Sequence, residues 1–287
     1  MNLSFIQKEL ETKGYCVVDH VLEPSEVKLC IDAFQTWQNN IPNHDIVCNE
    51  LNYHGIYKFH NVGHTWHSWF VRTHPRVQEI FKYIWNCNEL IVSFDGCCYI
   101  PKYSDKKDTC WTHTDQAPCL EGFHCVQGFV SFTENKERTF VVYEGSHKLH
   151  KPYFQERNCQ RDNNFQVIDP EFLASIIHTK KILHVKPGSL VLWDSRTFHQ
   201  NQYGAPNSET RMIQYVCFYP KDHPTNTNDV KQLRRQIFNT RRTTTHWPAP
   251  PRTIPLQPSV MAPYWIDYGI IPLPDLSCFQ NLINEIL

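Results

Sequence analysis

The chain has 287 residues, and its 28 Lys and Arg nearly balance its 29 Asp and Glu. A chain this neutral has no global field to draw it to nucleic acid or to an anionic membrane, although a local basic patch stays possible. Its apolar runs are far shorter than the ~20 residues that span a bilayer. These features argue against a membrane protein and indicate one large domain, or one domain with appendages.

The chain contains 12 cysteines, but their arrangement argues against a disulfide framework. Cys97 and Cys98 are adjacent, and several others lie in apolar runs, where a reduced cysteine packs as a small hydrophobic side chain. No pair has the CxxC spacing of a zinc site. The N-terminal segment is amphipathic and charged, unlike a secretory signal. We therefore predict a cytoplasmic protein with reduced thiols.

The first predicted elements are helices, with one short strand between them. Leu3–Thr12 is expected to form a helix, and Tyr15–Val18 a strand. Glu23–Glu26 has the proline and acids of a helix start, and apolar side chains then recur at helical spacing as far as Trp37. Arg76–Trp85 has the same spacing, so we predict another helix with one buried face.

The middle of the chain changes character. Short runs rich in Val, Ile, Phe and Tyr are separated by Gly, Pro and Asp, which predicts strands. They are Leu90–Phe94, Cys97–Ile100, Cys125–Phe132, Thr139–Tyr143, Ile182–Val185, Ser189–Trp193 and Arg211–Tyr219. A loop over Arg157–Asp169 and a short helix from Pro170 to about His178 are expected between them. Many short strands indicate an all-β core, either a jelly roll or a barrel, with flanking helices.

The C-terminal part, residues 221–287, is expected to pack on the core formed by residues 1–220. It begins with a predicted helix, Asn228–Arg242, which carries Lys231 and four arginines. Residues 247–263 contain six prolines and should be extended. An apolar tail follows from Tyr264 and ends in a predicted helix at Asp275–Leu287.

The first candidate metal ligands are His113 and Asp115. Residues i and i+2 of an extended chain point to the same side, so this imidazole and this carboxylate can approach one metal ion. The tripeptide alone is weak evidence, because a surface turn with a capping Asp has the same sequence.

His199 would complete a set of two histidines and one carboxylate. Such a set leaves open positions on the metal and is diagnostic of non-haem Fe(II) oxygenases. Twelve residues later Arg211 opens an apolar strand, and its planar guanidinium suits the far carboxylate of a 2-oxo acid. Each residue alone could equally be an ordinary core or surface residue. Their order and spacing together favour the oxygenase.

With these residues in place, the chain resembles the phytanoyl-CoA dioxygenase family of 2-oxoglutarate oxygenases. The resemblance covers roughly residues 10–220, whereas residues 221–287 match nothing in the family. Its motifs are Gly14–Val18 with Leu22–Val27, His113–Asp115, Tyr143–Lys148 (a "PGSHK"-like turn with Glu144 in place of Pro), Lys186–Ser189, His199 and Arg211.

The resemblance implies a double-stranded β-helix (cupin-like) core in residues 1–220. It also implies Fe(II) held by His113, Asp115 and His199, with 2-oxoglutarate bound by Arg211 and O2 as the oxidant. The expected reaction is hydroxylation of a small organic substrate, with release of succinate and CO2. Related halogenases lack the metal-binding carboxylate, so Asp115 favours hydroxylation.

Two further residues are predicted to contact the co-substrate. Gln127 lies in an otherwise apolar strand and needs a partner if it is buried. Lys58 could reach a carboxylate of 2-oxoglutarate or of the substrate, although it could also be an ordinary surface lysine. It lies in a segment rich in histidine and aromatic residues, Tyr53–His74, which we interpret as a wall or lid of the substrate pocket.

Two alternatives stay open. The enzyme could act on nucleic-acid bases, which would use the basic residues of Lys231–Arg242 to contact phosphates. The chain could also be a non-catalytic, cupin-like module with a structural metal. Arg211 argues against that second alternative, because a structural metal needs no residue that binds a co-substrate. The oligomeric state and the identity of the substrate are not predicted.

Overall fold

Two antiparallel β-sheets form the centre of the protein. The computed structural model describes residues 3–44, 53–255 and 271–287. The larger sheet has the strand order β1-β10-β6-β12-β4-β2, and β3 also pairs with β12. Its strands are β1 (Tyr15–Val18), β2 (Ile56–Tyr57), β3 (Leu90–Val92), β4 (Cys97–Ile100), β6 (Val126–Ser131), β10 (Leu190–Asp194) and β12 (Arg211–Pro220).

The smaller sheet has the order β8-β5-β11-β7-β9. Its strands are β5 (His113–Thr114), β7 (Phe140–Tyr143), β8 (Gln166–Val167), β9 (Lys180–Ile182) and β11 (His199–Asn201). Aromatic side chains from both sheets meet between them: the ring of Phe140 is 5.6 Å from that of Phe129 and 4.7 Å from that of Trp193. The predicted all-β core of the jelly-roll type is therefore confirmed.

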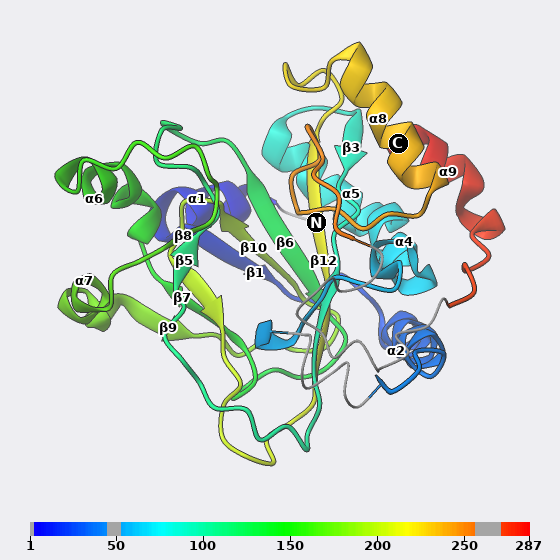
Figure 1. Ribbon diagram of the computed structural model, residues 1–287, viewed down its shortest axis with the longest axis horizontal. Coiled ribbons are helices and arrows are strands. Elements are labelled where there is room, and N and C mark those ends of the chain that lie inside the picture. The colour runs from blue at the N-terminus through cyan, green and yellow to red at the C-terminus, as the bar shows by residue number, and fades with distance from the viewer. Residues whose placement is uncertain (1–2, 45–52, 256–270) are drawn as a thin grey trace.

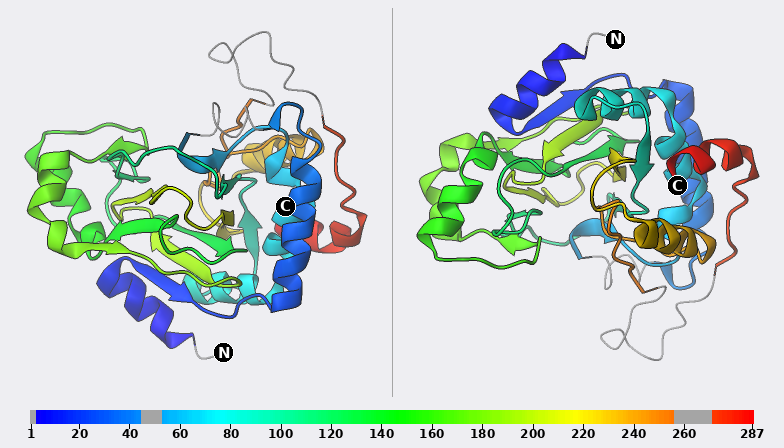
Figure 2. Two further views of the ribbon diagram at one scale, coloured as in Figure 1. Left: turned by 90° about the horizontal axis from the view of Figure 1, so that it is seen from below. Right: turned by 90° about the horizontal axis from the view of Figure 1, so that it is seen from above.

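Helices cover the larger sheet and close both ends of the molecule (Figures 1 and 2). They are α1 (Ser4–Lys13), α2 (Pro24–Gln38), α4 (Trp66–Thr73), α5 (Pro75–Trp85), α6 (His150–Glu156), α7 (Pro170–Ser175), α8 (Asn228–Asn239) and α9 (Gln280–Ile286). Single 3-10 turns are η2 (Tyr53–Gly55), η3 (Val62–His64), η4 (Ser146–Lys148), η5 (Ile177–Thr179) and η6 (Ser277–Phe279). Helices α6 and α7 lie beside the smaller sheet, and α2, α4, α5, α8 and α9 lie at the opposite end (Figure 1).

The predicted start of α2 shows how local sequence fixes an element. Glu23 and Glu26 form a reciprocal capping box, with Pro24 at the first helical position. The box satisfies two backbone N–H groups that a helix start leaves unpaired. From there the helix buries Phe34 and Trp37 against the core.

The segment from Trp66 to Thr73 differs from its interpretation as part of a pocket wall. It forms α4, which packs between α2 and β12. Trp69 and Arg72 are both fully buried there, and Trp66 packs on Phe279 from the C-terminal tail. Because apolar side chains surround α4 on several sides, the segment belongs to the core.

The alternative in which the basic residues of Lys231–Arg242 contact phosphates finds little support in their surroundings. Arg234 is fully buried, and Arg241 and Arg242 donate to the carbonyl oxygens of Phe238 and Ile254. These guanidinium groups donate hydrogen bonds to backbone carbonyl groups of the protein itself, and they are therefore poorly placed to contact phosphates. The helix itself ends at Asn239.

Smaller differences concern lengths and boundaries. The predicted loop Arg157–Asp169 contains β8. The strand predicted at Ile182–Val185 is displaced: β9 covers Lys180–Ile182 and shares only Ile182 with it. The later part of the predicted extended segment, Leu256–Pro263, and the start of the apolar tail, 264–270, lie outside the described residues. No helix in the described ranges is long and apolar enough to cross a membrane.

Candidate active site

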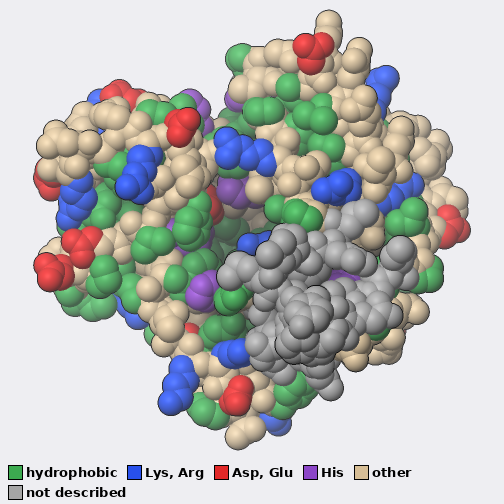
Figure 3. Space-filling model, in the orientation of Figure 1, with side chains coloured by type: hydrophobic (Ala, Val, Ile, Leu, Met, Phe, Trp, Pro, Cys, Tyr) green, Lys and Arg blue, Asp and Glu red, His purple; other side chains and the backbone are tan. Residues whose placement is uncertain are grey.

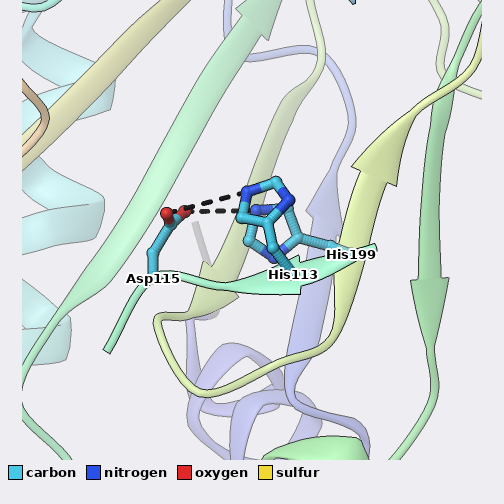
Figure 4. A group of neighbouring side chains, drawn as sticks. All are labelled: His113, Asp115 and His199. Atoms are coloured by element: carbon cyan, nitrogen blue, oxygen red, sulfur yellow. Dashed lines mark ion pairs between the residues drawn. The ribbon is translucent and has the colours of Figure 1, made fainter. Parts of the chain in front are cut away.

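Three predicted metal ligands meet on two neighbouring inner strands of the smaller sheet and the residues that follow them (Figure 4). His113 lies on β5 and is paired directly with His199 on β11, so the two imidazoles lie side by side. Asp115 follows β5 and is anchored by its N–H, which donates to the carbonyl oxygen of Ser195 at 2.9 Å. Its carboxylate oxygens are 3.6 Å from His113 Nε2 and 3.2 Å from His199 Nε2.

Backbone carbonyl groups hold both imidazoles in one orientation. His113 Nδ1 lies 3.1 Å from the carbonyl oxygen of Trp111, and His199 Nδ1 lies 2.8 Å from that of Thr197. A hydrogen bond at Nδ1 leaves Nε2 as the free nitrogen of each ring, which is how metal-binding histidines are commonly oriented. The Gln127 amide donates to Asp115 Oδ2 at 2.9 Å and so orients the carboxylate.

The electrostatics of the site suit a divalent metal. Burial alone would raise the pKa of Asp115, but its electrostatic interactions with the nearby imidazoles, that of His113 first, hold it well below its usual value. The pKa of His113 is lowered, chiefly by burial and then by the charge of His199. An ionised carboxylate beside neutral imidazoles is the state that binds metal. Within the described ranges, no other group of His, Cys, Asp and Glu gathers in this way.

The surroundings of Arg211 indicate whether the site fits a dicarboxylate co-substrate. The side chain is fully buried on β12, yet none of its three guanidinium nitrogens has a hydrogen-bond partner in the described part of the chain. Its guanidinium carbon lies 5.3 Å from the centre of the Phe129 ring. A buried cation without an anion is strongly unfavourable. A carboxylate of 2-oxoglutarate would satisfy it.

The three ligands open into a cavity of about 470 Å³. Figure 3 shows this face of the molecule hollowed at its centre, with hydrophobic and histidine side chains around the hollow. Aromatic rings provide much of the lining: Tyr53, Tyr57, Trp111, Phe140, Phe165, Trp193, Tyr215 and Trp247. Arg211 is not a lining residue. It lies on β12 four residues before Tyr215, on the same side of the strand.

The segment rich in histidine and aromatic residues divides in two. Its beginning lines the cavity, with Tyr53, His54, Tyr57 and the predicted residue Lys58. Its later part turns away: His64 Nε2 lies 3.0 Å from the carbonyl oxygen of Arg242, within the helical layer. Whether the first part closes over a substrate stays a prediction.

The sequence-based prediction missed one wall of the cavity. Residues 243–247, Arg252 and Ile254 line it from the C-terminal part of the chain. His246 lies close enough to help lower the pKa of Asp115, and burial lowers the pKa of His246 itself to about 4. The only signal in the sequence was a histidine and a tryptophan next to prolines, and nothing in that pattern indicates a position beside residues 113–115.

Comparison with known proteins agrees with this geometry. Residues 10–203 match the sequence profile of the family described as phytanoyl-CoA dioxygenase. The Ava biosynthesis cluster protein O of Aspergillus versicolor is 28% identical over 268 residues, which cover 84% of each chain.

Solved structures share the fold. EctD from S. alaskensis, determined with 2-oxoglutarate and 5-hydroxyectoine, aligns with a TM-score of 0.53 and 16% identity, over 75% of this chain and 74% of that one. The non-heme monooxygenase ThoJ aligns with a TM-score of 0.53 and 15% identity, over 76% of this chain and 78% of that one.

The profile match spans more than half of the chain, and the order of the motifs agrees with it. The protein belongs to the phytanoyl-CoA dioxygenase family of Fe(II)- and 2-oxoglutarate-dependent oxygenases.

Proposed function

We propose that this oxygenase hydroxylates a small organic molecule, with His113, Asp115 and His199 holding the iron and Arg211 binding 2-oxoglutarate. The observation that carries the proposal is the buried guanidinium of Arg211, which has no hydrogen-bond partner among the described residues and lies on the strand that also contributes Tyr215 to the cavity of the three candidate ligands. When bound, Fe(II) with 2-oxoglutarate and O2 supplies the oxidising power, and the co-substrate leaves as succinate and CO2.

The residues around the iron position the reactants and exclude water. Two imidazoles and one carboxylate leave metal positions open for the co-substrate and for O2. Gln127 orients Asp115 through its hydrogen bond. That bond supports a role for Gln127 in the metal centre, and its contact with 2-oxoglutarate stays a prediction. Lys58 lines the cavity and is proposed to attract an acidic group of the co-substrate or the substrate.

The size and lining of the cavity support a small-molecule substrate. A volume of about 470 Å³ lies in the range of small-molecule sites, and its aromatic walls suit rings and apolar groups. The relative from A. versicolor is named for a biosynthesis cluster, which favours a biosynthetic intermediate here as well. A base in a nucleic acid is less favoured as the substrate. Three arginines that could have contacted phosphates, Arg234, Arg241 and Arg242, instead donate to carbonyl groups of the protein itself.

We also propose that residues 221–287 belong to the same catalytic unit as residues 1–220. Ile237, Phe238 and Ile283 share one hydrophobic core with the strands of the larger sheet, which supports this division. A cytoplasmic location is supported by the cysteines of the described ranges, all of which are free.

The metal assignment is tested with single variants. We expect His113→Ala, Asp115→Ala and His199→Ala each to abolish 2-oxoglutarate-dependent release of succinate and to weaken Mn(II) binding in calorimetry, because each removes one of three ligands. Thermal unfolding should show that the fold is kept. His178→Ala, an exposed histidine on η5, is the matched control and should leave both readouts unchanged. Near-normal metal affinity in one of the three variants would show that its residue is wrongly assigned.

A further inference from the structure

The C-terminal wall of the cavity is a short hairpin. Thr244 and Thr253 pair as an antiparallel bridge. The N–H of Thr245 donates to the carbonyl oxygen of Arg252 at 2.9 Å, and that of Ile254 donates to the carbonyl oxygen of Thr243 at 2.8 Å. Residues 243–254 therefore leave the helical layer and return to it. They lie outside the matched family region, residues 10–203.

Several hydrogen bonds fix this hairpin to the rest of the protein. Thr244 and Phe94 exchange two of them: the Thr244 N–H donates to the Phe94 carbonyl oxygen at 2.9 Å, and the Phe94 N–H donates to Thr244 Oγ1 at 3.0 Å. Arg234 donates to the carbonyl oxygen of Pro248 at 2.6 Å, and Thr225 donates to that of Ala249 at 2.9 Å. The hairpin is thus a fixed part of the cavity wall.

Three consecutive side chains of the hairpin each have a buried polar atom that finds no hydrogen-bond partner among residues 3–44, 53–255 and 271–287. They are Thr245 Oγ1, His246 Nε2 and Trp247 Nε1, and all three residues line the cavity. Buried polar atoms almost always have hydrogen-bond partners, so each exception requires an explanation. Three in a row, on residues that line the cavity containing the candidate iron ligands, indicate a place for a polar group of a ligand beside them.

Aromatic rings surround the same space. Trp111 stacks on His113 with ring centres 4.8 Å apart at 21°, and Phe165 lies 4.6 Å from the His113 ring. Trp247 itself is held edge-on against Tyr219, at 6.0 Å and 80°. Aromatic walls of this kind favour flat or ring-shaped ligands.

We propose that Thr245, His246 and Trp247 form a recognition triplet that hydrogen-bonds an oxygen substituent of a ring-containing substrate. This inference rests on the proposed oxygenase function and adds to it the chemical class of the substrate. The triplet holds the oxygen substituent while the aromatic walls hold the ring. The family motifs bind the metal and the co-substrate, and the C-terminal hairpin selects what is hydroxylated.

Two probes that differ by one hydroxyl group test the triplet. Equilibrium dialysis is used to measure the binding of 2-naphthol and of naphthalene to the full chain loaded with Mn(II) and 2-oxoglutarate, so that no turnover occurs. His246→Leu should weaken 2-naphthol binding by roughly fivefold, as expected for one lost hydrogen bond, and should change naphthalene binding by less than twofold. Thr245→Val, which keeps the shape and removes the hydroxyl group, combined with Trp247→Phe, which keeps an aromatic ring and removes the N–H group, should act in the same direction.

The controls separate this inference from the oxygenase proposal. His178→Ala should change neither probe, and calorimetry should give the same 2-oxoglutarate affinity for all these variants as for the wild type. If the wild type binds no 2-oxoglutarate, the proposed function fails, whatever the naphthol result. If 2-oxoglutarate binds normally but the variants lose both probes equally, or neither, the triplet is overturned. It is also overturned if neither probe binds the loaded wild type.

Discussion

The sheet core and the helical layer of this protein each contain a fully buried arginine, and the two have opposite surroundings. Arg234 on α8 donates to four backbone carbonyl groups, those of Val92, Pro248, Ile286 and Leu287, at 2.6–3.3 Å. Arg211 on β12 has no hydrogen-bond partner for any guanidinium nitrogen in the described part of the chain. Both side chains are fully buried.

The difference separates a structural role from a binding role. Carbonyl groups that converge on Arg234 compensate for the loss of water and tie three separate segments of the chain together. Among the described residues Arg211 has no such compensation, so its charge requires an anion such as a carboxylate of the co-substrate. A buried charged residue therefore indicates a binding role only if the protein provides no hydrogen-bond partners for it.

The largest effect on stability is expected from substituting Arg234, the arginine with a structural role. Arg234→Leu should lower the free energy of unfolding by about 3–5 kcal/mol, because it removes a buried cation and leaves its acceptors unpaired. Urea denaturation measures this change. Arg235→Leu, at the exposed neighbouring position, is the control and should stay within about 0.5 kcal/mol of the wild type. A loss below about 1 kcal/mol for Arg234→Leu would contradict the structural role.

For Arg211, the arginine proposed to bind 2-oxoglutarate, a substitution should lower ligand affinity and not stability. Arg211→Lys should weaken 2-oxoglutarate binding by about 10- to 150-fold, because an ammonium group cannot replace the bidentate contact and one charged hydrogen bond is lost. Stability without co-substrate should change little, because the guanidinium has no partner to lose. Calorimetry with Mn(II) gives the affinity, and Arg196→Lys, whose arginine pairs with Asp194, is the control. Unchanged affinity in Arg211→Lys would exclude Arg211 as the anchor.

Part of the candidate metal site was predictable from a short-range signal. His113 and Asp115 are two residues apart, and His199 and Arg211 were identified by their order along the chain and by the family resemblance. The strands that bring the histidines together, β5 and β11, have only two and three residues. Elements this short have no periodic pattern of their own, so they were not predicted as strands.

The wall of the cavity and the core helix α4 were not predictable for a different reason. Helix α4 buries polar side chains such as His67 and Arg72 together with Trp69, so its sequence lacks a clear apolar face. The hairpin that carries His246 reaches the cavity only because α8 and the loop around Phe94 hold it there. Such long-range contacts have no signature in the local sequence.

The smallest effect is expected from the two basic residues of α8 that do face solvent. Lys231 and Arg235 are exposed, whereas the guanidinium of Arg241 lies 4.1 Å over the ring of Phe238. Lys231→Ser with Arg235→Ser should leave stability and 2-oxoglutarate turnover unchanged, because these side chains contact neither the core nor the cavity. Fluorescence anisotropy with a short DNA duplex should detect little binding in either protein. If the wild type bound DNA and the double variant reduced the salt dependence of log K by about 0.9 per lost contact, the nucleic-acid alternative would replace the small-molecule substrate.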